Sequence, residues 1–451
     1  MAKIYIKTMG CKVNTYDSHA LETSLRQKGH TVLLSPDSAD VCIINSCSVT
    51  AKADRESRYW ARKFRKNKAD TKVVATGCYA QTDSKNLLDM EEIDLVVPNQ
   101  DKDRLVEVLE NRIKTGFTTI KPEDKLPEGT KPVSKNRQGH FKSSLKLLAA
   151  DSSQTRSFLK IQDGCNGFCT YCLIPFARGQ SRSVTPEEVK EEVRRQIDNG
   201  INEIVFTGIH IGDYGRDISS NKDAEPFAQL LEELFCWPDM VRVRISSLEP
   251  AELSDRLLEV LKANRDLVCP HFHFPLQSGN NRILKLMRRT YTKELYQQKV
   301  KQAREAFPDA FFGADVIPGF PSETDEEFQE TVHFLKELNL SEIHVFPYSK
   351  RPGTAAAKMP HHIDLQVVKE RATILRTLST DLKKAFIRSQ LESQQEVLWE
   401  GQCLEDGRRT GRTRNYIDVV SRANNVPLAN SLSQIKLAGF YSEKYVLGQI
   451  T

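Results

Sequence analysis

Three closely spaced cysteines restrict the fold and chemistry of this chain more than any other feature. Cys165, Cys169 and Cys172 form a C-x3-C-x2-C motif directly after a predicted strand. Gly164 and Gly167 allow the backbone to turn tightly around a bound group. Three thiolates at this spacing suit an iron–sulfur cluster with one iron left open to a substrate. Structural zinc is the alternative, but such sites normally have four protein ligands and no fourth is evident here.

The cysteine motif opens a regular series of strands and helices. Six predicted strands, all separated by helical segments, cover residues 158–162, 203–207, 241–246, 271–276, 311–317 and 342–348. Thr185 and Thr324 each begin a capping-box pattern that marks a helix start. Six βα units predict a partial (β/α)6 barrel or open parallel sheet, with functional groups at the carboxyl ends of the strands.

A second set of cysteines lies in an earlier α/β segment. Strands are predicted at residues 3–8, 30–34, 41–45, 72–75 and 93–97, with amphipathic helices at 18–28 and 51–66, which indicates a doubly wound parallel sheet. Cys11, Cys47 and Cys78 each follow one of these strands. The carboxyl ends of parallel strands meet at one edge, so these thiols are expected to converge there. The alternative is that they are ordinary buried cysteines.

Length and composition complete the outline. A chain of 451 residues predicts about three domains. We expect an N-terminal domain at 2–114, a Lys-, Pro- and Ser-rich linker at 115–150, a core at 151–382 and a small all-β module at 383–450. No apolar run approaches membrane-spanning length, and a cytoplasmic location is expected. In a reducing compartment the ten cysteines favour metal or redox chemistry over disulfides.

The cysteine motif and the array behind it resemble the radical S-adenosylmethionine (SAM) superfamily. The segments GCKVNTYDS, INSCSVT and GCYAQ resemble the ligand segments of the radical SAM methylthiotransferase family. RISSLEP, HFHFPLQSGNN, MRRTYT and DVIPGFPSET also match that family in kind. The resemblance covers nearly the whole chain and implies a C-terminal RNA-binding module of the TRAM type.

This resemblance implies two [4Fe-4S] clusters and SAM as cofactors. The cluster on Cys11, Cys47 and Cys78 would carry the sulfur that one SAM methylates. The cluster on Cys165, Cys169 and Cys172 would cleave a second SAM to a 5′-deoxyadenosyl radical. An electron donor and a sulfur source are implied as partners, without their identities. No acid–base pair stands out, and cofactor-borne radical chemistry does not require one.

Five residues are candidates for SAM contact. By resemblance, Tyr171 lies near the adenine, and Thr207 and Gly208 occupy the place of a Gly-Gly-Glu segment that binds the amino group. This chain reads TGI there, without the acidic side chain. Ser246 ends a strand and could hydrogen-bond polar groups of a ligand, and Gly319 permits close backbone approach. Each has a structural alternative, as a core aromatic, a strand-end residue or a turn glycine. The histidines, including His271 and His273, lack ligand spacing and are expected to be packed or solvated.

Local basic clusters favour an RNA partner. The net charge is only +5, but a predicted helix at 52–72 and the segment RRTGRTRNY concentrate positive charge. The candidate RNA-binding residues of that segment are Arg408, Arg409, Arg412, Arg414 and Tyr416. Arginine binds phosphate, and tyrosine stacks on bases. A solvated charged surface is the alternative.

The segments GCKVN and RISSLEP resemble the branch that acts on N6-threonylcarbamoyladenosine. The resemblance therefore implies methylthio transfer to C2 of that nucleoside next to the anticodon in tRNA. Two alternatives keep the chemistry but change the substrate, to isopentenyladenosine in tRNA or to an aspartate of a ribosomal protein. A third hypothesis is a non-catalytic RNA-binding metalloprotein with structural zinc.

Overall fold

The computed structural model describes residues 1–117, 125–127, 155–221, 223–423 and 425–450. The chain divides into two compact units. Unit 1 contains Met1–Asp151, Gln162–Arg182 and Ser349–Lys358, and unit 2 contains Ser152–Ile161, Ser183–Tyr348 and Met359–Thr451. Most of the predicted linker at 115–150 lies outside the described residues. Among the described residues, no helix has the length and apolar character needed to cross a membrane.

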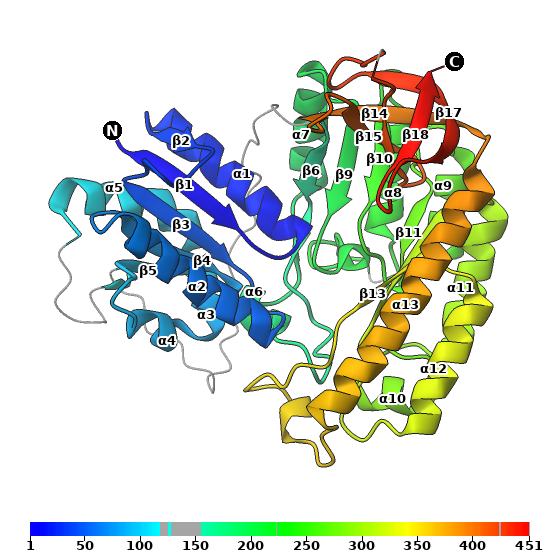
Figure 1. The fold of residues 1–451 in the computed structure, drawn as a ribbon, viewed down its shortest axis with the longest axis horizontal. Helices are drawn as coiled ribbons and strands as arrows, with labels where there is room; N and C mark the ends of the chain where they lie inside the picture. The colour runs from blue at the N-terminus through cyan, green and yellow to red at the C-terminus, as the bar shows by residue number, and fades with distance from the viewer. Residues whose placement is uncertain (118–124, 128–154, 222, 424, 451) are drawn as a thin grey trace. The chain divides into compact units, whose positions relative to one another are not determined.

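Unit 1 is built on a five-stranded parallel sheet, drawn in blue and cyan in Figure 1. The strand order is β2-β1-β3-β4-β5. The strands are β1 (Lys3–Thr8), β2 (Thr31–Leu33), β3 (Val41–Ser46), β4 (Lys72–Gly77) and β5 (Leu95–Pro98). All neighbouring pairs are parallel, as the doubly wound prediction requires.

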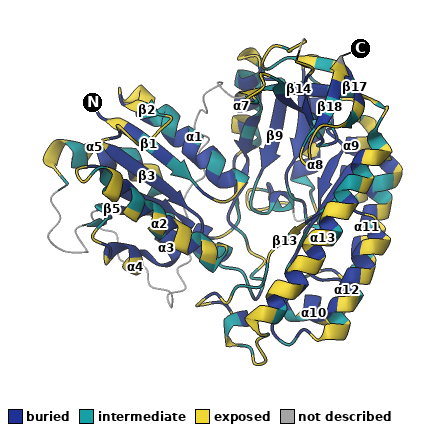
Figure 2. Ribbon diagram, viewed as in Figure 1, coloured by how far each residue is buried: buried dark blue, intermediate teal, exposed yellow. Residues whose placement is uncertain are grey.

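Helices cover both faces of this sheet. They are α1 (Lys12–Gln27), α2 (Ala51–Asn67), α3 (Cys78–Thr82), α4 (Ser84–Leu88) and α5 (Leu105–Thr115). Leu21 of α1 and Leu109 of α5 share one apolar core with Ile43 of β3. Phe64 of α2 and Ile44 of β3 belong to the core on the opposite face. β3 is buried along its whole length because it is central and covered on both sides (Figure 2).

Unit 2 contains the six strands predicted for the core. They are β6 (Ser157–Lys160), β9 (Glu203–Thr207), β10 (Arg242–Ile245), β11 (His271–His273), β12 (Phe311–Val316) and β13 (Glu342–Val345). They form two parallel three-stranded sheets, β10-β9-β6 and β11-β12-β13. Isolated parallel bridges, including Ser247 with His273, connect the two sheets between β10 and β11. The result is the predicted partial barrel.

Helices alternate with these strands. They are α7 (Pro186–Asp198), α8 (Pro226–Phe235), α9 (Asp255–Ala263), α10 (Asn281–Leu286), α11 (Lys293–Ala306), α12 (Asp325–Leu338) and α13 (Leu365–Gln390). Both predicted capping boxes are present. The Thr185 side chain accepts a hydrogen bond from the Glu188 backbone N–H, and the Thr324 side chain accepts one from the Glu327 backbone N–H. The short strands β7 (Gln162–Asp163) and β8 (Arg182–Ser183) flank the cysteine segment, which also contains α6 (Ile174–Arg178).

The C-terminal module of unit 2 is a closed five-stranded barrel. Its strands are β14 (Gln394–Cys403), β15 (Arg409–Thr413), β16 (Asp418–Val420), β17 (Leu432–Phe440) and β18 (Val446–Ile450). The order is β14-β15-β16-β18-β17, and closure removes the exposed sheet edges. Trp399 is fully buried in the barrel core with Ile435 and Leu437. The predicted all-β module is therefore present.

The compact units are divided differently from the predicted domains. The cysteine segment Gln162–Arg182 belongs to unit 1, together with the later segment Ser349–Lys358, although both were assigned to the barrel core from the sequence. Side-chain contacts to the N-terminal sheet, described below, account for this grouping. The domain boundaries themselves stay predictions.

Candidate functional site

The first cysteine set lies at one edge of the unit 1 sheet. Cys11 is the N-cap residue of α1, directly beyond β1. Cys47 follows β3, and Cys78 begins α3 at the end of β4. Since β1, β3 and β4 are adjacent and parallel, their carboxyl ends bring the three residues to one edge, as the sequence predicts.

The surroundings of these thiols suit a bound metal cluster. Burial, together with the neighbouring Cys78 and Cys11, raises the pKa of Cys47 to about 12. Burial also raises the pKa of Cys78, although Arg178 opposes that effect. Gly10 has φ +92°, and a Cβ there would lie 2.8 Å from the Cys47 Sγ atom. Several thiols that are crowded and hard to ionise alone form a site that metal ions can stabilise, because binding replaces the thiol protons.

The second cysteine set differs from the first, in which Cys11 is exposed and Cys47 and Cys78 are buried. Cys165, Cys169 and Cys172 are all half-buried. The Gly167 backbone donates to the Cys165 sulfur at 3.3 Å, and the Ile174 backbone donates to the Cys172 sulfur at 3.4 Å. A Cβ on Gly167 would lie 3.4 Å from one sulfur and 3.8 Å from another. Backbone N–H donors to sulfur and an accessible opening suit a cluster that binds a substrate.

Both cysteine sets belong to unit 1. Helix α6, which follows Cys172, packs against α3, which begins at Cys78. Asn99, at the start of the short helix η1 (Asn99–Arg104), donates to the Ala177 carbonyl at 2.8 Å. The Asn99 amide also lies 3.8 Å from the Cys78 sulfur. The sequence motifs do not show that the two sets are structural neighbours.

The candidate SAM-contacting residues have mixed environments. Tyr171 is half-buried within the cysteine segment, and Thr207 is buried at the end of β9. The Ser246 hydroxyl is buried and has no hydrogen-bond partner among the described residues, so it remains available to a ligand. A Cβ on Gly319 would lie 2.4 Å from Val368 of α13, which gives this glycine a packing reason of its own.

Two carboxylates lie beside His210, shortly after the TGI segment. His210 lies two residues beyond Gly208, and its Nε2 atom is 2.6 Å from a Glu252 oxygen. Its Nδ1 atom is 3.4 Å from an Asp213 oxygen. These carboxylates come from turns that sequence spacing does not connect to the TGI segment.

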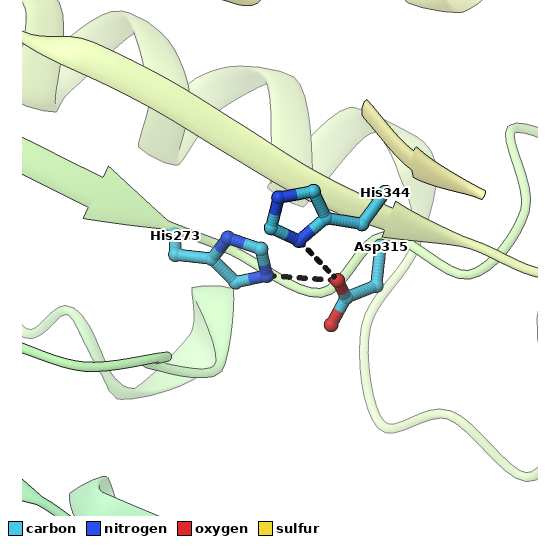
Figure 3. A group of neighbouring side chains, drawn as sticks. All are labelled: His273, Asp315 and His344. Atoms are coloured by element: carbon cyan, nitrogen blue, oxygen red, sulfur yellow. Dashed lines mark ion pairs between the residues drawn. The ribbon is translucent and has the colours of Figure 1, made fainter. Parts of the chain in front are cut away.

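A second histidine–carboxylate cluster lies across three strands of unit 2. In Figure 3, His273 of β11 and His344 of β13 both point toward Asp315 of β12. One Asp315 oxygen is 2.9 Å from His273 Nε2 and 3.4 Å from His344 Nδ1. The ligand atoms lie close enough together for a metal ion. The expectation that His273 is merely packed or solvated is therefore incomplete, because its partners come from other strands.

The charged side chains of this cluster also form an ion-pair network. Hydrogen bonds that His344 donates to Asp315 and Glu342 raise its pKa to about 9. Burial raises the pKa of Asp315, but the charges and hydrogen bonds of His273 and His344 outweigh it, and the net pKa lies below the ordinary value. The arrangement is thus a protonated His344 between two carboxylates.

The C-terminal arginines differ from the exposed surface expected from the sequence. Arg412 pairs with Asp418 at 2.7 Å, and Arg414 donates to the Arg265 and Val268 carbonyls. Tyr416 packs against the His271 ring, with centroids 4.1 Å apart. Arg414 and Tyr416 dock the barrel onto the parallel sheets of unit 2, whereas the Arg412–Asp418 pair lies within the barrel. Arg408 and Arg409 are half-buried and also have partners, Asp406 and backbone carbonyls.

Helix α2 presents an exposed basic surface. Tyr59 is 55% exposed. Lys63 lies 4.6 Å from the Trp60 ring centroid, and Lys7 lies 4.3 Å from the same ring. The exposed basic residues of the helix are Lys52, Arg55, Arg62 and Lys66. Cations and aromatic rings together on one surface are typical of RNA-binding sites.

Comparison with known families gives two matches. The model described as "Radical SAM superfamily" matches residues 159–335. The model described as "Uncharacterized protein family UPF0004" matches residues 3–98. The two matches correspond to the two regions that carry the cysteine sets.

Curated relatives resemble nearly the whole chain. A threonylcarbamoyladenosine tRNA methylthiotransferase of Bacillus subtilis is 39% identical, covering 93% of this chain and 90% of the relative. The protein of the same name in Aquifex aeolicus is 37% identical, and the alignment covers 92% of this chain and 96% of the relative. A tRNA-2-methylthio-N(6)-dimethylallyladenosine synthase of Protochlamydia amoebophila is 33% identical, and the alignment covers 100% of this chain and 96% of the relative.

A solved structure shares the fold. The radical SAM methyltransferase TsrM from Kitasatospora setae superimposes with a TM-score of 0.54 at 16% identity, covering 78% of this chain and 75% of that one. At this identity the likeness supports the fold alone.

Proposed function

The chain belongs to the radical SAM methylthiotransferases, tRNA-modifying enzymes that use SAM and [4Fe-4S] clusters, and on that premise we propose its substrate. The proposed reaction is methylthio transfer to C2 of N6-threonylcarbamoyladenosine next to the anticodon in tRNA. SAM would serve both as methyl donor and as the source of the 5′-deoxyadenosyl radical.

The observation that carries the substrate proposal is the pattern of identity among relatives. Two relatives named for threonylcarbamoyladenosine are 39% and 37% identical over more than nine-tenths of this chain, and two others are 32% and 33% identical. A relative named for dimethylallyladenosine is 33% identical. Its substrate is the second candidate, because the alignment with that relative covers the whole chain.

The six cysteines are the proposed cluster ligands. Cys11, Cys47 and Cys78 would hold one cluster, and the crowding of the three thiols supports this, with Cys47 and Cys78 buried and Cys11 exposed. Cys165, Cys169 and Cys172 would hold the other, where Gly167 leaves room among the sulfurs. When bound, the clusters and SAM supply the one-electron and methyl-transfer chemistry. The side chains supply the ligand set, the backbone donors and the enclosure.

The SAM site is proposed at the carboxyl ends of the parallel strands. Thr207 and Gly208 end β9, and Ser246 follows β10. The unpaired Ser246 hydroxyl is the observation that most favours a polar ligand there. Tyr171 and Gly319 remain candidates by resemblance. Substrates of barrel enzymes bind at this end of the strands.

The proposal that the partner is RNA rests mainly on the exposed face of α2. Its exposed basic residues and Tyr59 offer phosphate contacts and a stacking surface. Of the C-terminal candidates, Arg408 is best placed for RNA, because Arg414 and Tyr416 dock the barrel and Arg412 is paired with Asp418 inside it. The electron donor and sulfur source are proposed as further partners.

Analysis of bulk tRNA tests the proposal. The chain is expressed in a host that contains threonylcarbamoyladenosine but lacks this methylthiotransferase, and the digested nucleosides are examined by mass spectrometry. The expected product is 2-methylthio-N6-threonylcarbamoyladenosine, absent from cells carrying Cys169→Ala. Methylthiolated isopentenyladenosine instead would favour the second candidate. A methylthio group only on a ribosomal protein aspartate would contradict both tRNA assignments.

A test of metal content addresses the zinc hypothesis. Anaerobic reconstitution of the wild-type chain should give about eight irons per chain, the content of two four-iron clusters. Tightly bound zinc in place of iron, with no SAM cleavage, would favour a structural metalloprotein.

A further inference from the structure

Arg178 is a buried residue that contacts both cysteine-bearing regions of unit 1. It ends α6, six residues after Cys172, and is only 2% exposed. Its Nη1 atom donates to both oxygens of Asp163 at 3.0 and 3.1 Å, beside the Cys165 motif. Its Nη2 atom donates to Asn14 at 2.5 Å and to Asp17 at 3.2 Å.

Asn14 and Asp17 attach Arg178 to the first cysteine set. Both lie in the first turns of α1, whose N-cap residue is Cys11. The Asn14 amide also donates to the Ser46 carbonyl at 3.1 Å, next to Cys47. One guanidinium group therefore joins the segment of the second set to two strand ends of the first set.

Arg351 makes a separate connection at another position. This residue is 5% exposed and belongs to Ser349–Lys358, which is part of unit 1. Its Nη2 atom donates to Asp54 of α2 at 2.6 Å and to Ser48 at 3.0 Å. Ser48 directly follows Cys47, and its hydroxyl is 3.0 Å from Thr82 of α3.

The same segment also reaches the second cysteine set. The Ala356 backbone donates to the Thr170 carbonyl at 2.8 Å, and Thr170 directly follows Cys169. The Thr354 hydroxyl donates to the Arg351 carbonyl at 2.7 Å and so fixes the turn between the two contacts. Ser349–Lys358 thus connects Cys47 to Cys169 within unit 1.

Arginine is well suited to such a connection. Its planar group makes several hydrogen bonds in fixed directions, whereas lysine is a flexible point charge that holds one direction poorly. Buried ion pairs contribute little net stability compared with apolar packing. The two buried arginines are therefore better explained by a role in fixing geometry than by added stability. Two independent arginines thus connect the two cysteine sets, Arg178 directly and Arg351 through the segment that carries it.

We propose that Arg178 and Arg351 are positioning residues that hold the two cysteine sets at a fixed separation. This separation would couple SAM cleavage at one cluster to methylthio transfer involving the other. The coupling part rests on the proposed function, while the fixed separation does not.

The test compares full-length Arg178→Lys and Arg351→Lys with the wild type. Each protein is reconstituted anaerobically, and its iron content is measured. Arg194→Lys is the matched control, since Arg194 pairs with Asp239 at 2.5 Å on the exposed surface of unit 2. Three quantities are then measured: 5′-deoxyadenosine, methylthiolated nucleoside, and the magnetic interaction between the reduced clusters by electron paramagnetic resonance.

Both lysine variants should retain the iron content of the wild type and continue to form 5′-deoxyadenosine. The ratio of 5′-deoxyadenosine to methylthiolated nucleoside should rise about ten-fold or more, because small displacements of reacting groups are costly. The magnetic interaction should change in both variants, and Arg194→Lys should match the wild type in all three measurements.

Three results would overturn the proposal. The first is loss of a cluster in both variants, which would make the arginines supports of the ligands themselves. The second is a parallel fall in both products, and the third is an unchanged magnetic interaction. If the wild type forms no methylthiolated nucleoside, the proposed function fails, and the magnetic interaction alone still decides whether the arginines fix the separation.

Discussion

At the residue scale, the ten cysteines fall into distinct environments. The six candidate ligands occupy strand ends and the loop before α6, where backbone donors or neighbouring thiols surround them. Cys42 and Cys269 are buried, as expected for core residues. Cys236 and Cys403 are exposed and fill no core. Position beside a strand end, more than burial, distinguishes the proposed ligands.

Single cysteine substitutions should separate the two proposed clusters. Cys169→Ala should reduce the iron content to about half and abolish 5′-deoxyadenosine formation, because the cluster at the open site loses a ligand. Cys78→Ala should also lose about half of the iron but retain 5′-deoxyadenosine formation, while methylthio transfer ceases. Iron analysis and product chromatography measure both effects.

Cys236→Ala is the control for these variants. Its side chain is exposed at the end of α8, outside both cysteine sets. It should retain the iron content and both products of the wild type. Continued 5′-deoxyadenosine formation by Cys169→Ala would contradict the assigned ligand role.

At the element scale, the strands β11, β12 and β13 create a cluster that no single segment contains. Asp315 and His344 are direct partners in the register of β12 and β13. His273 reaches the same carboxylate from β11 (Figure 3). Parallel pairing of these strands brings residues that are about 30 to 70 positions apart in the sequence onto one face of the sheet. The cluster follows from strand order and register together.

The protonation of His344 should make stability depend on pH. Its pKa of about 9 in the folded chain exceeds the ordinary value of 6.5. The stabilising contribution is therefore complete below about pH 6.5 and is lost as pH rises through 9. The side chain is 47% exposed, so solvent screening limits the effect to about 1 kcal/mol.

Denaturant unfolding of the wild type and His344→Gln between pH 6 and pH 9.5 measures this effect. The variant should be less stable near pH 6, and the difference should vanish above pH 9. His333→Gln is the control, because His333 is exposed on α12 outside the cluster. A difference that grows with pH would contradict a protonated His344.

The exposed face of α2 should contribute to tRNA binding. Replacing Lys52, Arg55 and Lys66 together by alanine removes three exposed charges from one helix. The affinity for tRNA should fall, and its dependence on salt should become weaker by about one unit of slope for each phosphate that the variant no longer binds. Filter binding at several salt concentrations measures both quantities.

A triple variant with charges removed elsewhere controls for net charge. Lys262, Lys301 and Lys336 are exposed on α9, α11 and α12 of unit 2. Their replacement by alanine should change the salt dependence less than the α2 variant does. Equal effects of the two triple variants would show that only net charge matters.

At the scale of the whole molecule, buried charge joins the C-terminal barrel to the parallel sheets of unit 2. Glu203 of β9 is fully buried and pairs with Arg242 and Arg244 at 2.8 and 2.9 Å. Burial raises the Glu203 pKa, but the two arginines outweigh it and lower the pKa below its ordinary value. Arg244 also donates to the Arg414 carbonyl at 2.9 Å, and Arg242 pairs with Glu396 of β14 at 3.0 Å.

Loss of the Glu203 charge should destabilise this assembly. Glu203→Gln leaves two buried guanidinium groups without their carboxylate and should lower the free energy of unfolding by about 3 kcal/mol. Unfolding in urea, followed by tryptophan fluorescence, reports the change because Trp399 lies in the barrel core. Glu233→Gln removes an exposed partner of Lys190 and should cost less than about 1 kcal/mol. Equal effects would contradict a buried pairing role.

Local patterns account for the elements that were predicted successfully. The periodic apolar residues of β3 and β9 identify buried strands, and the capping residues Thr185 and Thr324 mark helix starts. The adjacency of Cys11, Cys47 and Cys78 follows from parallel order alone. In each case the relevant physics acts between residues close in sequence or between neighbouring strands.

The arginines of the C-terminal module show where local patterns fail. RRTGRTRNY has the composition of an RNA-binding hairpin. In the fold, however, Arg412 forms an ion pair with Asp418, and Arg414 donates hydrogen bonds to backbone carbonyls of another segment. Arg178, whose contacts span 164 positions of sequence, has no local signature at all. Partner choice for a long charged side chain depends on what the fold places beside it.

The sequence by itself determined the order of strands and helices, the six candidate cysteine ligands and the family to which the chain belongs. These properties depend on hydrophobic periodicity, capping and fixed ligand spacing, which are local. The tertiary structure decided which charges are buried, that His273 meets Asp315 and His344, and that the two cysteine sets share one compact unit. Burial and long-range pairing arise only when distant segments pack, because the electrostatic energy of a charge depends on the surroundings that packing creates.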